Sequence, residues 1–214
     1  MKTILFDLDG TLIQTTEIIL DTFVLTFEKF FPSIKLSETE LTNMLGHTLF
    51  TTFEFYTDSK ETVDQMVAYY REQSNLKIEE GLKAYPGAAE TMKYLKNKGC
   101  TVGVVTSKMR KVATYHLELT GLNLYVDGLI GYEDTEKHKP NPDPVLKALE
   151  LFNAKKESTV YVGDHENDMT AAKKAGISSC AVTYSHRLKE MLSLIHISEP
   201  TRQAEISYAV FCLK

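Results

Sequence analysis

The sequence is poor in cysteine and has no long apolar run, and each shortage bears on where the protein works. Its three cysteines, Cys100, Cys180 and Cys212, are scattered and form no CxxC pair, so we expect free thiols in a reducing cytoplasm. No apolar stretch is long enough to span a bilayer. Asp7 and Asp9 interrupt the N-terminal apolar run almost at once, which argues against a secretory signal peptide.

Positive charge is also in short supply. Lysine and arginine together number 24 against 29 aspartates and glutamates, giving a net charge of −5. This balance supports neither a nucleic-acid partner nor an anionic membrane partner. The apolar fraction of 43% and the charged fraction of 25% are ordinary for globular chains. The 214 residues suit one good-sized domain, or a core domain with an insert. We expect a monomer or a weak homodimer.

The last part of the chain resembles a cloning artefact. "LSLIHISEPTR", residues 192–202, is similar to the translation of a widely used sequencing adapter, and "ISYAVFCL" is similar to the translation of the primer that follows it. We therefore expect residues 192–214 to be a non-native tail. Such a tail would replace the natural C-terminal segment, and it would lower the stability of the chain.

Strand and helix patterns alternate over most of the chain. Buried-strand patterns are "KTILFDL", "CTVGVVT", "VDGLIG", "STVYVGD" and "SSCAV". Helical patterns that end at glycine or begin with proline separate the later strands. This order predicts an α/β fold with a doubly wound parallel sheet. The predicted catalytic core comprises residues 1–14 and 81–191.

Residues 15–80 interrupt this alternation with helix-period patterns alone. The clearest are "TTEIILDTFVLTFEKFF", "SETELTNML" and "SKETVDQMVAYYREQSN". Ser37 and Glu40 form a capping-box pattern at the start of the second. The sequence therefore predicts an inserted all-α domain.

Polar residues gather where the predicted strands end. Asp7 and Asp9 follow the first strand, Thr106 and Ser107 the second, and Asp164 follows "TVYVG", with Asp168 four residues later. Lys139 lies just before a helix. These groups converge if the sheet is doubly wound, because its functional groups gather at the carboxyl ends of the strands.

A cluster of this kind has a charge problem. Two carboxylates about 5 Å apart repel each other by roughly 3 kcal/mol at an effective dielectric constant near 20. One lysine cannot cancel several of them, whereas a hard divalent cation can, and all-oxygen ligands favour Mg²⁺. No His/Cys set has zinc spacing. Such a site suits phosphoryl transfer with a carboxylate nucleophile. Each residue alone has an ordinary structural explanation, but the ordered set is specific.

Four motifs of the chain resemble those of the haloacid-dehalogenase superfamily: "FDLDGT", "VVTSK", "HKPNPDP" and "VGDHEND". The resemblance implies Asp7 as nucleophile and Asp9 as acid/base. It implies that Mg²⁺ is held by Asp7, the backbone carbonyl of Asp9, and Asp164, with Asp168 supporting. It implies that phosphate is bound by Thr106 and Lys139, and we add Ser107 and Lys108 as candidates. The insert matches the cap domain of the superfamily, which selects the substrate.

Asp9 narrows the expected chemistry further. Dehalogenases and phosphonate-cleaving members lack an aspartate at this position, so Asp9 favours hydrolysis of a phosphate ester or anhydride. The chain is most similar to bacterial pyrophosphatases and phosphoglycolate phosphatases, so we expect pyrophosphate or a small phosphate ester as substrate. In the insert, Arg71 and His47 are candidates for a substrate contact, although a solvated helix charge and an ordinary loop histidine are the alternative interpretations.

Two other functions remain open. A sugar-phosphate mutase of the β-phosphoglucomutase type would keep the same motifs, but its cap would reorient a bisphosphate intermediate. A phosphoryl-accepting receiver module also places Asp, Thr and Lys at strand ends, but receivers are about half this length and carry no cap.

Overall fold

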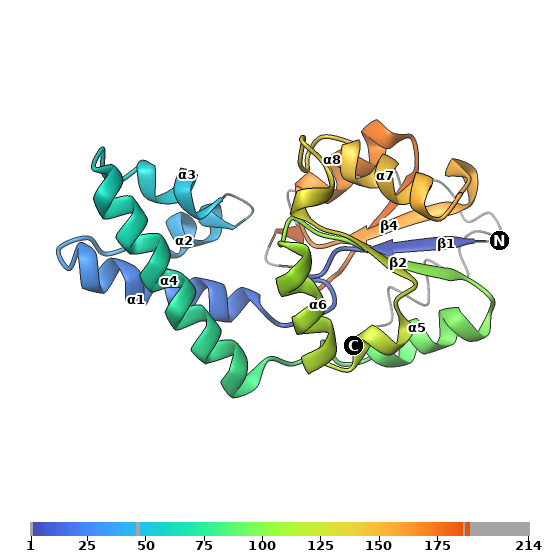
Figure 1. Ribbon diagram of the computed structural model, residues 1–214, viewed down its shortest axis with the longest axis horizontal. Helices are drawn as coiled ribbons and strands as arrows, with labels where there is room; N and C mark the ends of the chain where they lie inside the picture. The colour runs from blue at the N-terminus through green and yellow to red at the C-terminus, as the bar shows by residue number, and fades with distance from the viewer. Residues whose placement is uncertain (1, 46–47, 186, 189–214) are drawn as a thin grey trace. The chain divides into compact units, whose positions relative to one another are not determined.

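The computed structural model describes residues 2–45, 48–185 and 187–188 (Figure 1). The predicted tail, residues 192–214, and His47 lie outside this part of the chain. The chain divides into two compact units, which are described separately. One comprises Met1–Ile13 and Lys83–Lys214, and the other comprises Gln14–Leu82.

The first unit contains a five-stranded sheet with the strand order β3-β2-β1-β4-β5 in the described residues. Its strands are β1 (Thr3–Phe6), β2 (Thr101–Val105), β3 (Gly128–Ile130), β4 (Thr159–Gly163) and β5 (Ser178–Ala181). All four strand pairs are parallel. The predicted α/β class with a doubly wound parallel sheet is confirmed.

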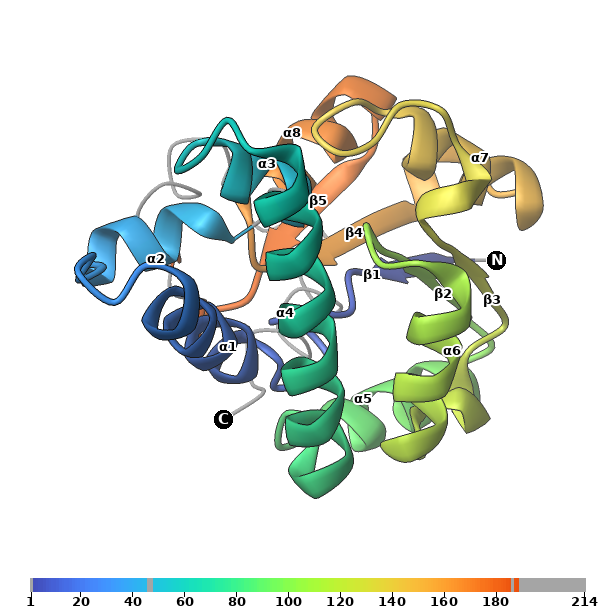
Figure 2. The same ribbon diagram turned by 60° about the vertical axis from the view of Figure 1, so that its left-hand side comes forward.

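Helices cover both faces of this sheet (Figures 1 and 2). They are α5 (Ala88–Asn97), α6 (Arg110–Leu119), α7 (Asp143–Leu151) and α8 (Glu166–Ala175), with short 3-10 helices at Leu122–Tyr125, Tyr132–Asp134 and Lys156–Ser158. Leu5 and Tyr161 belong to a buried cluster with apolar residues of α7 and α8. α5 lies on the opposite face, where Met92 is fully buried. The central strands are thus buried on both faces, which explains their continuous apolar sequences.

The chain adds β2 and β3 on one side of β1 and then β4 and β5 on the other. This reversal explains where polar groups meet. β1 pairs with β2 on one side and with β4 on the other. The next residue, Asp7, donates its backbone N–H to the carbonyl oxygen of Val162 at 2.8 Å. The carboxyl ends of β1 and β4 therefore lie side by side at the switch point of the sheet, where such folds bind ligands.

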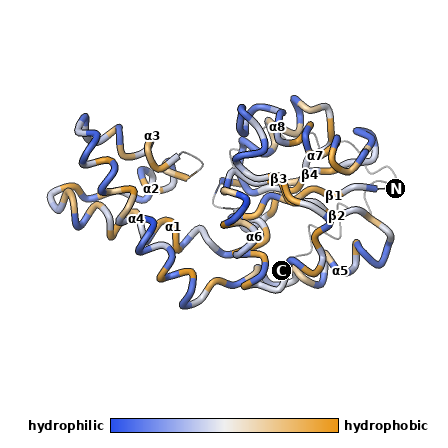
Figure 3. Tube along the Cα trace, viewed as in Figure 1, coloured by the Kyte–Doolittle hydropathy of each residue, from blue (hydrophilic) through white to orange (hydrophobic). Residues whose placement is uncertain are grey.

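In the described residues of the second unit, helices are the only regular secondary structure, and loops join them. Its helices are α1 (Thr16–Phe30), α2 (Glu38–Met44), α3 (Leu49–Glu54) and α4 (Lys60–Gly81). Ser37 and Glu40 form the predicted capping box. The unit has its own core, in which Phe23 packs against Phe53 and Tyr70. Hydrophilic and hydrophobic residues alternate along α1 and α4 (Figure 3), as expected for helices with one buried side.

Across the described residues of both units, no helix has the combination of length and apolar character that crossing a membrane requires.

Candidate active site

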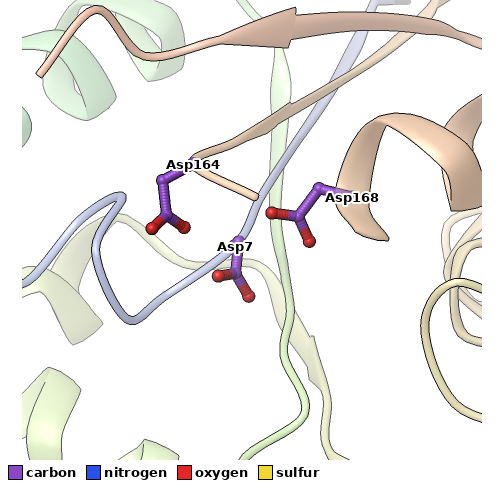
Figure 4. A group of neighbouring side chains, drawn as sticks. All are labelled: Asp7, Asp164 and Asp168. Atoms are coloured by element: carbon purple, nitrogen blue, oxygen red, sulfur yellow. The ribbon is translucent and has the colours of Figure 1, made fainter. Parts of the chain in front are cut away.

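Three carboxylates meet at the carboxyl end of the sheet (Figure 4). Asp7 follows β1, Asp164 follows β4, and Asp168 lies in the first turn of α8. One oxygen atom from each lies within 4.8 Å of the other two. Asp7 is 7% exposed and Asp168 is 1% exposed, so water screens little of their mutual repulsion. The structure thus brings together these three residues, which the sequence places at or just after strand ends.

Lys139 supplies positive charge to this cluster. Its Nζ atom lies 2.7 Å from Asp7 Oδ1 and 2.7 Å from Asp168 Oδ1. It also donates to the hydroxyl oxygen of Tyr161 at 3.1 Å, and that hydroxyl donates to the carbonyl oxygen of Val105 at 2.7 Å. All three donors of the ammonium group therefore have acceptors, and its position is tightly determined.

Burial first, and then mutual repulsion, raises the pKa values of the carboxylates in this cluster. Burial raises the pKa of Asp7 to about 7, with Lys139 acting to lower it and Asp168 to raise it. The pKa of Asp164 is raised well above its usual value, first by burial and then by Asp7 and Asp168. Burial disfavours the charged form of Lys139, but the two aspartates outweigh it and raise its pKa. One lysine thus leaves carboxylates that are costly to ionise.

The donor set fits a hard divalent cation. Its atoms are carboxylate oxygens, which suit Mg²⁺ and not a soft metal. Both oxygens of Asp168 already accept hydrogen bonds, Oδ1 from Lys139 and Oδ2 from the backbone N–H of His165 at 3.0 Å. Asp164 Oδ1 accepts from the Thr11 hydroxyl at 3.1 Å. Asp7 and Asp164 therefore keep more lone pairs for a metal than Asp168 does.

The other predicted residues line the ends of β1 and β2. Lys108 Nζ lies 2.6 Å from Asp9 Oδ1, and the Lys108 backbone N–H donates to Thr106 Oγ1 at 3.2 Å. Thr106 is buried, and in the described part of the chain its hydroxyl oxygen accepts a hydrogen bond while the structure shows no acceptor for its proton. Ser107 is exposed. Arg71 is exposed on α4 in the helical unit, so its predicted substrate contact stays a prediction.

Sequence analysis did not single out Tyr161. It occupies the middle of β4, where "TVYVG" has the composition of an ordinary buried strand. Its hydroxyl nevertheless contacts both Lys139 and Val105. The available signal was the tyrosine itself in a mostly apolar strand, since a buried tyrosine hydroxyl usually has a hydrogen-bond partner.

Gly10 lies in the turn after Asp9 and leaves room for Asp164. Its φ of +74° falls in the left-handed region, and a Cβ atom there would lie 2.1 Å from Asp164 Oδ2. We expect Gly10→Ala to displace the Asp164 carboxylate and to lower the free energy of unfolding by roughly 1–3 kcal/mol. Mg²⁺ affinity should fall as well. Chemical denaturation and calorimetric titration with Mg²⁺ measure the two effects.

Gly99→Ala is the matched control for this substitution. Gly99 has a similar φ of +72°, but a Cβ atom there meets nothing within 4 Å. The control should therefore lose only the roughly 1–2 kcal/mol of backbone strain and leave Mg²⁺ affinity unchanged. If Gly10→Ala bound Mg²⁺ as tightly as the control, the turn would have no part in placing Asp164.

Known proteins share both the sequence and the fold. The model of the haloacid dehalogenase-like hydrolase family matches residues 4–182. The chain is 38% identical to pyrophosphatase PpaX of Halalkalibacterium halodurans, over 87% of this chain and 86% of that protein. It is 36% identical to PpaX of Bacillus cereus strain G9842, over 86% and 84%. A haloacid dehalogenase-like family hydrolase from Streptococcus pneumoniae superposes with a TM-score of 0.77 at 22% identity, over 97% and 98%.

These matches decide between the general classes of function considered above. A receiver module is excluded, because the family model extends over both units of the chain. The predicted enzyme class, a phosphatase of this superfamily, is confirmed by the family and its pyrophosphatase relatives. The chain belongs to the haloacid dehalogenase-like hydrolase family.

Proposed function

We propose that the chain is a Mg²⁺-dependent phosphohydrolase that forms an aspartyl-phosphate on Asp7 and acts on pyrophosphate or a small phosphate ester such as phosphoglycolate. The observation that carries the proposal is the buried carboxylate of Asp7 beside Asp164 and Lys139. The relatives named pyrophosphatase support the choice of pyrophosphate as the first substrate to test.

Asp7, Asp164 and the backbone carbonyl of Asp9 would hold the cation, with Asp168 supporting it through water. Asp168 already accepts hydrogen bonds from Lys139 and His165, which favours that indirect role. When bound, Mg²⁺ would offset the carboxylate charge and the charge of the phosphate oxygens.

The side chains divide the chemistry between them. The Asp7 carboxylate attacks phosphorus, and the bond from phosphorus to the leaving oxygen breaks. Asp9 gives a proton to the leaving oxygen and later takes one from the water that hydrolyses the acyl phosphate. Lys139 holds Asp7 in place through Oδ1, and the Thr106 hydroxyl donates to a phosphate oxygen. The helical unit would act as the cap, with Arg71 and His47 as candidate substrate contacts.

A phosphate-release screen tests this function. Pyrophosphate, phosphoglycolate and several sugar phosphates should be compared with and without Mg²⁺. Release that requires Mg²⁺ supports the proposal, and the preferred compound identifies the substrate class. A sugar 1-phosphate converted to its isomer without free phosphate would instead support the mutase. The cytoplasmic location and the monomeric or weakly dimeric state remain part of this proposal.

Mg²⁺ binding should compete with protons. Because the pKa of Asp7 is raised to about 7, part of the protein carries a proton there at pH 6.5, and a cation must displace it. We expect Mg²⁺ affinity to fall by up to about tenfold per pH unit below pH 7. Titration calorimetry in two buffers of different ionisation enthalpy measures the released proton. Equal heats in both buffers at pH 6.5 would contradict this expectation.

A further inference from the structure

His116 is a buried histidine that the proposed function does not use. It lies on α6 and is 1% exposed. Its Nδ1 atom lies 3.0 Å from Lys108 Nζ, and the same Nζ atom lies 2.6 Å from Asp9 Oδ1. The imidazole is therefore joined to the proposed acid/base through one lysine side chain.

The chemistry of the two groups determines the direction of this hydrogen bond. A lysine ammonium group carries three N–H donors and no acceptor, so His116 Nδ1 must accept. This requires a neutral imidazole with its proton on Nε2. Burial, followed by the positive charge of Lys108, lowers the pKa of His116 to about 4. The imidazole is thus neutral at physiological pH and can serve as a permanent acceptor.

The two lysines of the site differ in the donors they have left. Lys139 uses all three, on Asp7, Asp168 and Tyr161. Lys108 uses two, on Asp9 and His116, which leaves one N–H for another acceptor. With its side chain 18% exposed, Lys108 is still reached by solvent. Lys108 is therefore the better placed of the two to donate to a phosphate oxygen without losing an existing bond.

We propose that His116 is a positioning residue for substrate binding: it accepts a hydrogen bond from Lys108 and holds the ammonium beside Asp9 with one donor directed to the substrate phosphate. This inference rests on the proposed function, because it needs a phosphate compound in the site. Without His116, Lys108 would keep its ion pair with Asp9 but would rotate freely about it. Substrate binding should then weaken more than turnover.

A pair of substitutions of similar shape separates hydrogen bonding from packing. His116→Asn keeps an acceptor atom near the position of Nδ1, whereas His116→Leu fills the space without one. We expect His116→Leu to raise KM roughly five- to tenfold for the best compound of the screen, with kcat changed less than twofold. His116→Asn should keep KM within about twofold of the original. Equal KM values for the two variants, with both folded by circular dichroism, would overturn the proposal.

A double-mutant cycle tests whether His116 acts through Lys108. Lys108→Met should raise KM by itself, and adding His116→Leu to it should have no further effect. Effects on kcat/KM that simply add would show that His116 acts independently, and would overturn the proposal. Lys111→Met is the matched control, because Lys111 is exposed on the same helix. It should leave KM unchanged.

The side-chain ¹⁵N signals of histidine give a readout that needs no turnover. At pH 7 we expect His116 as the Nε2–H tautomer, with an unprotonated Nδ1 whose signal shifts in Lys108→Met. The opposite tautomer, or a signal indifferent to that substitution, would overturn the positioning role. If no phosphate compound is turned over, the proposed function has failed, and this spectrum still decides whether Lys108 and His116 interact as proposed.

Discussion

Asp7→Asn is expected to reduce phosphate release by roughly 10³-fold or more, because it removes the proposed nucleophile. The same substitution should not harm the fold. An asparagine oxygen can still accept the hydrogen bond from Lys139, and the neutral amide removes one negative charge from the cluster. Steady-state phosphate release and thermal unfolding without Mg²⁺ measure the two effects.

The stability effect of Asp7→Asn has a definite pH dependence. The pKa of Asp7 rises from 3.8 to about 7 on folding, so its ionisation opposes folding as pH increases through that range. The free energy of unfolding of the variant should therefore exceed that of the parent protein most at pH 8, and by little at pH 4. Asp58→Asn, at an exposed position of the helical unit, is the control and should change neither phosphate release nor thermal stability. Full turnover by Asp7→Asn would refute the aspartyl-phosphate mechanism.

Lys139→Met should cause a large loss of stability. The Lys139 side chain is only 7% exposed, and its removal leaves Asp7 and Asp168 without the ammonium group that they share. Breaking such a buried ion pair typically costs about 3–5 kcal/mol. We expect a loss of this size in the free energy of unfolding at pH 8 without Mg²⁺, measured by chemical denaturation.

Protons or Mg²⁺ should recover part of that loss, because either one reduces the carboxylate charge. The deficit of Lys139→Met should therefore be smaller at pH 5.5 than at pH 8, and smaller again with saturating Mg²⁺. Lys147→Met is the control. Lys147 is 47% exposed and pairs with Glu150 on the surface of α7, so its loss should cost under about 0.5 kcal/mol. Similar losses for the two variants would show that the cluster does not need Lys139.

The site could be predicted where chemistry and strand order are visible in local sequence. Asp7 and Asp164 each follow an apolar strand, and a doubly wound sheet brings the carboxyl ends of such strands to the same edge, so their proximity could be predicted once that winding was assumed. The contact between Tyr161 and Val105 could not be predicted in this way. Tyr161 is on β4 and Val105 is on β2, with β1 between them, so their contact depends on the order of three strands.

Two other features escaped prediction for different physical reasons. α3, Leu49–Glu54, is only six residues long, which is too short for helical periodicity to appear. His116 could be placed in a helix. Its contact with Lys108, however, depends on the direction of a lysine side chain in the loop before that helix. Side-chain direction across a loop is not encoded in residue spacing.

The hydrogen bond between Thr11 and Asp164 joins positions 153 residues apart in the chain. A ribosome makes about 5–20 residues per second, so β1 exists for roughly 8–30 s before β4 has been synthesised. During that time β1, the middle strand of the final sheet, lacks at least one of its two neighbours, and the carboxylates have not yet been brought together. The nascent chain therefore carries an exposed strand edge that could pair wrongly, while the repulsion within the cluster arises only in the last stage of folding.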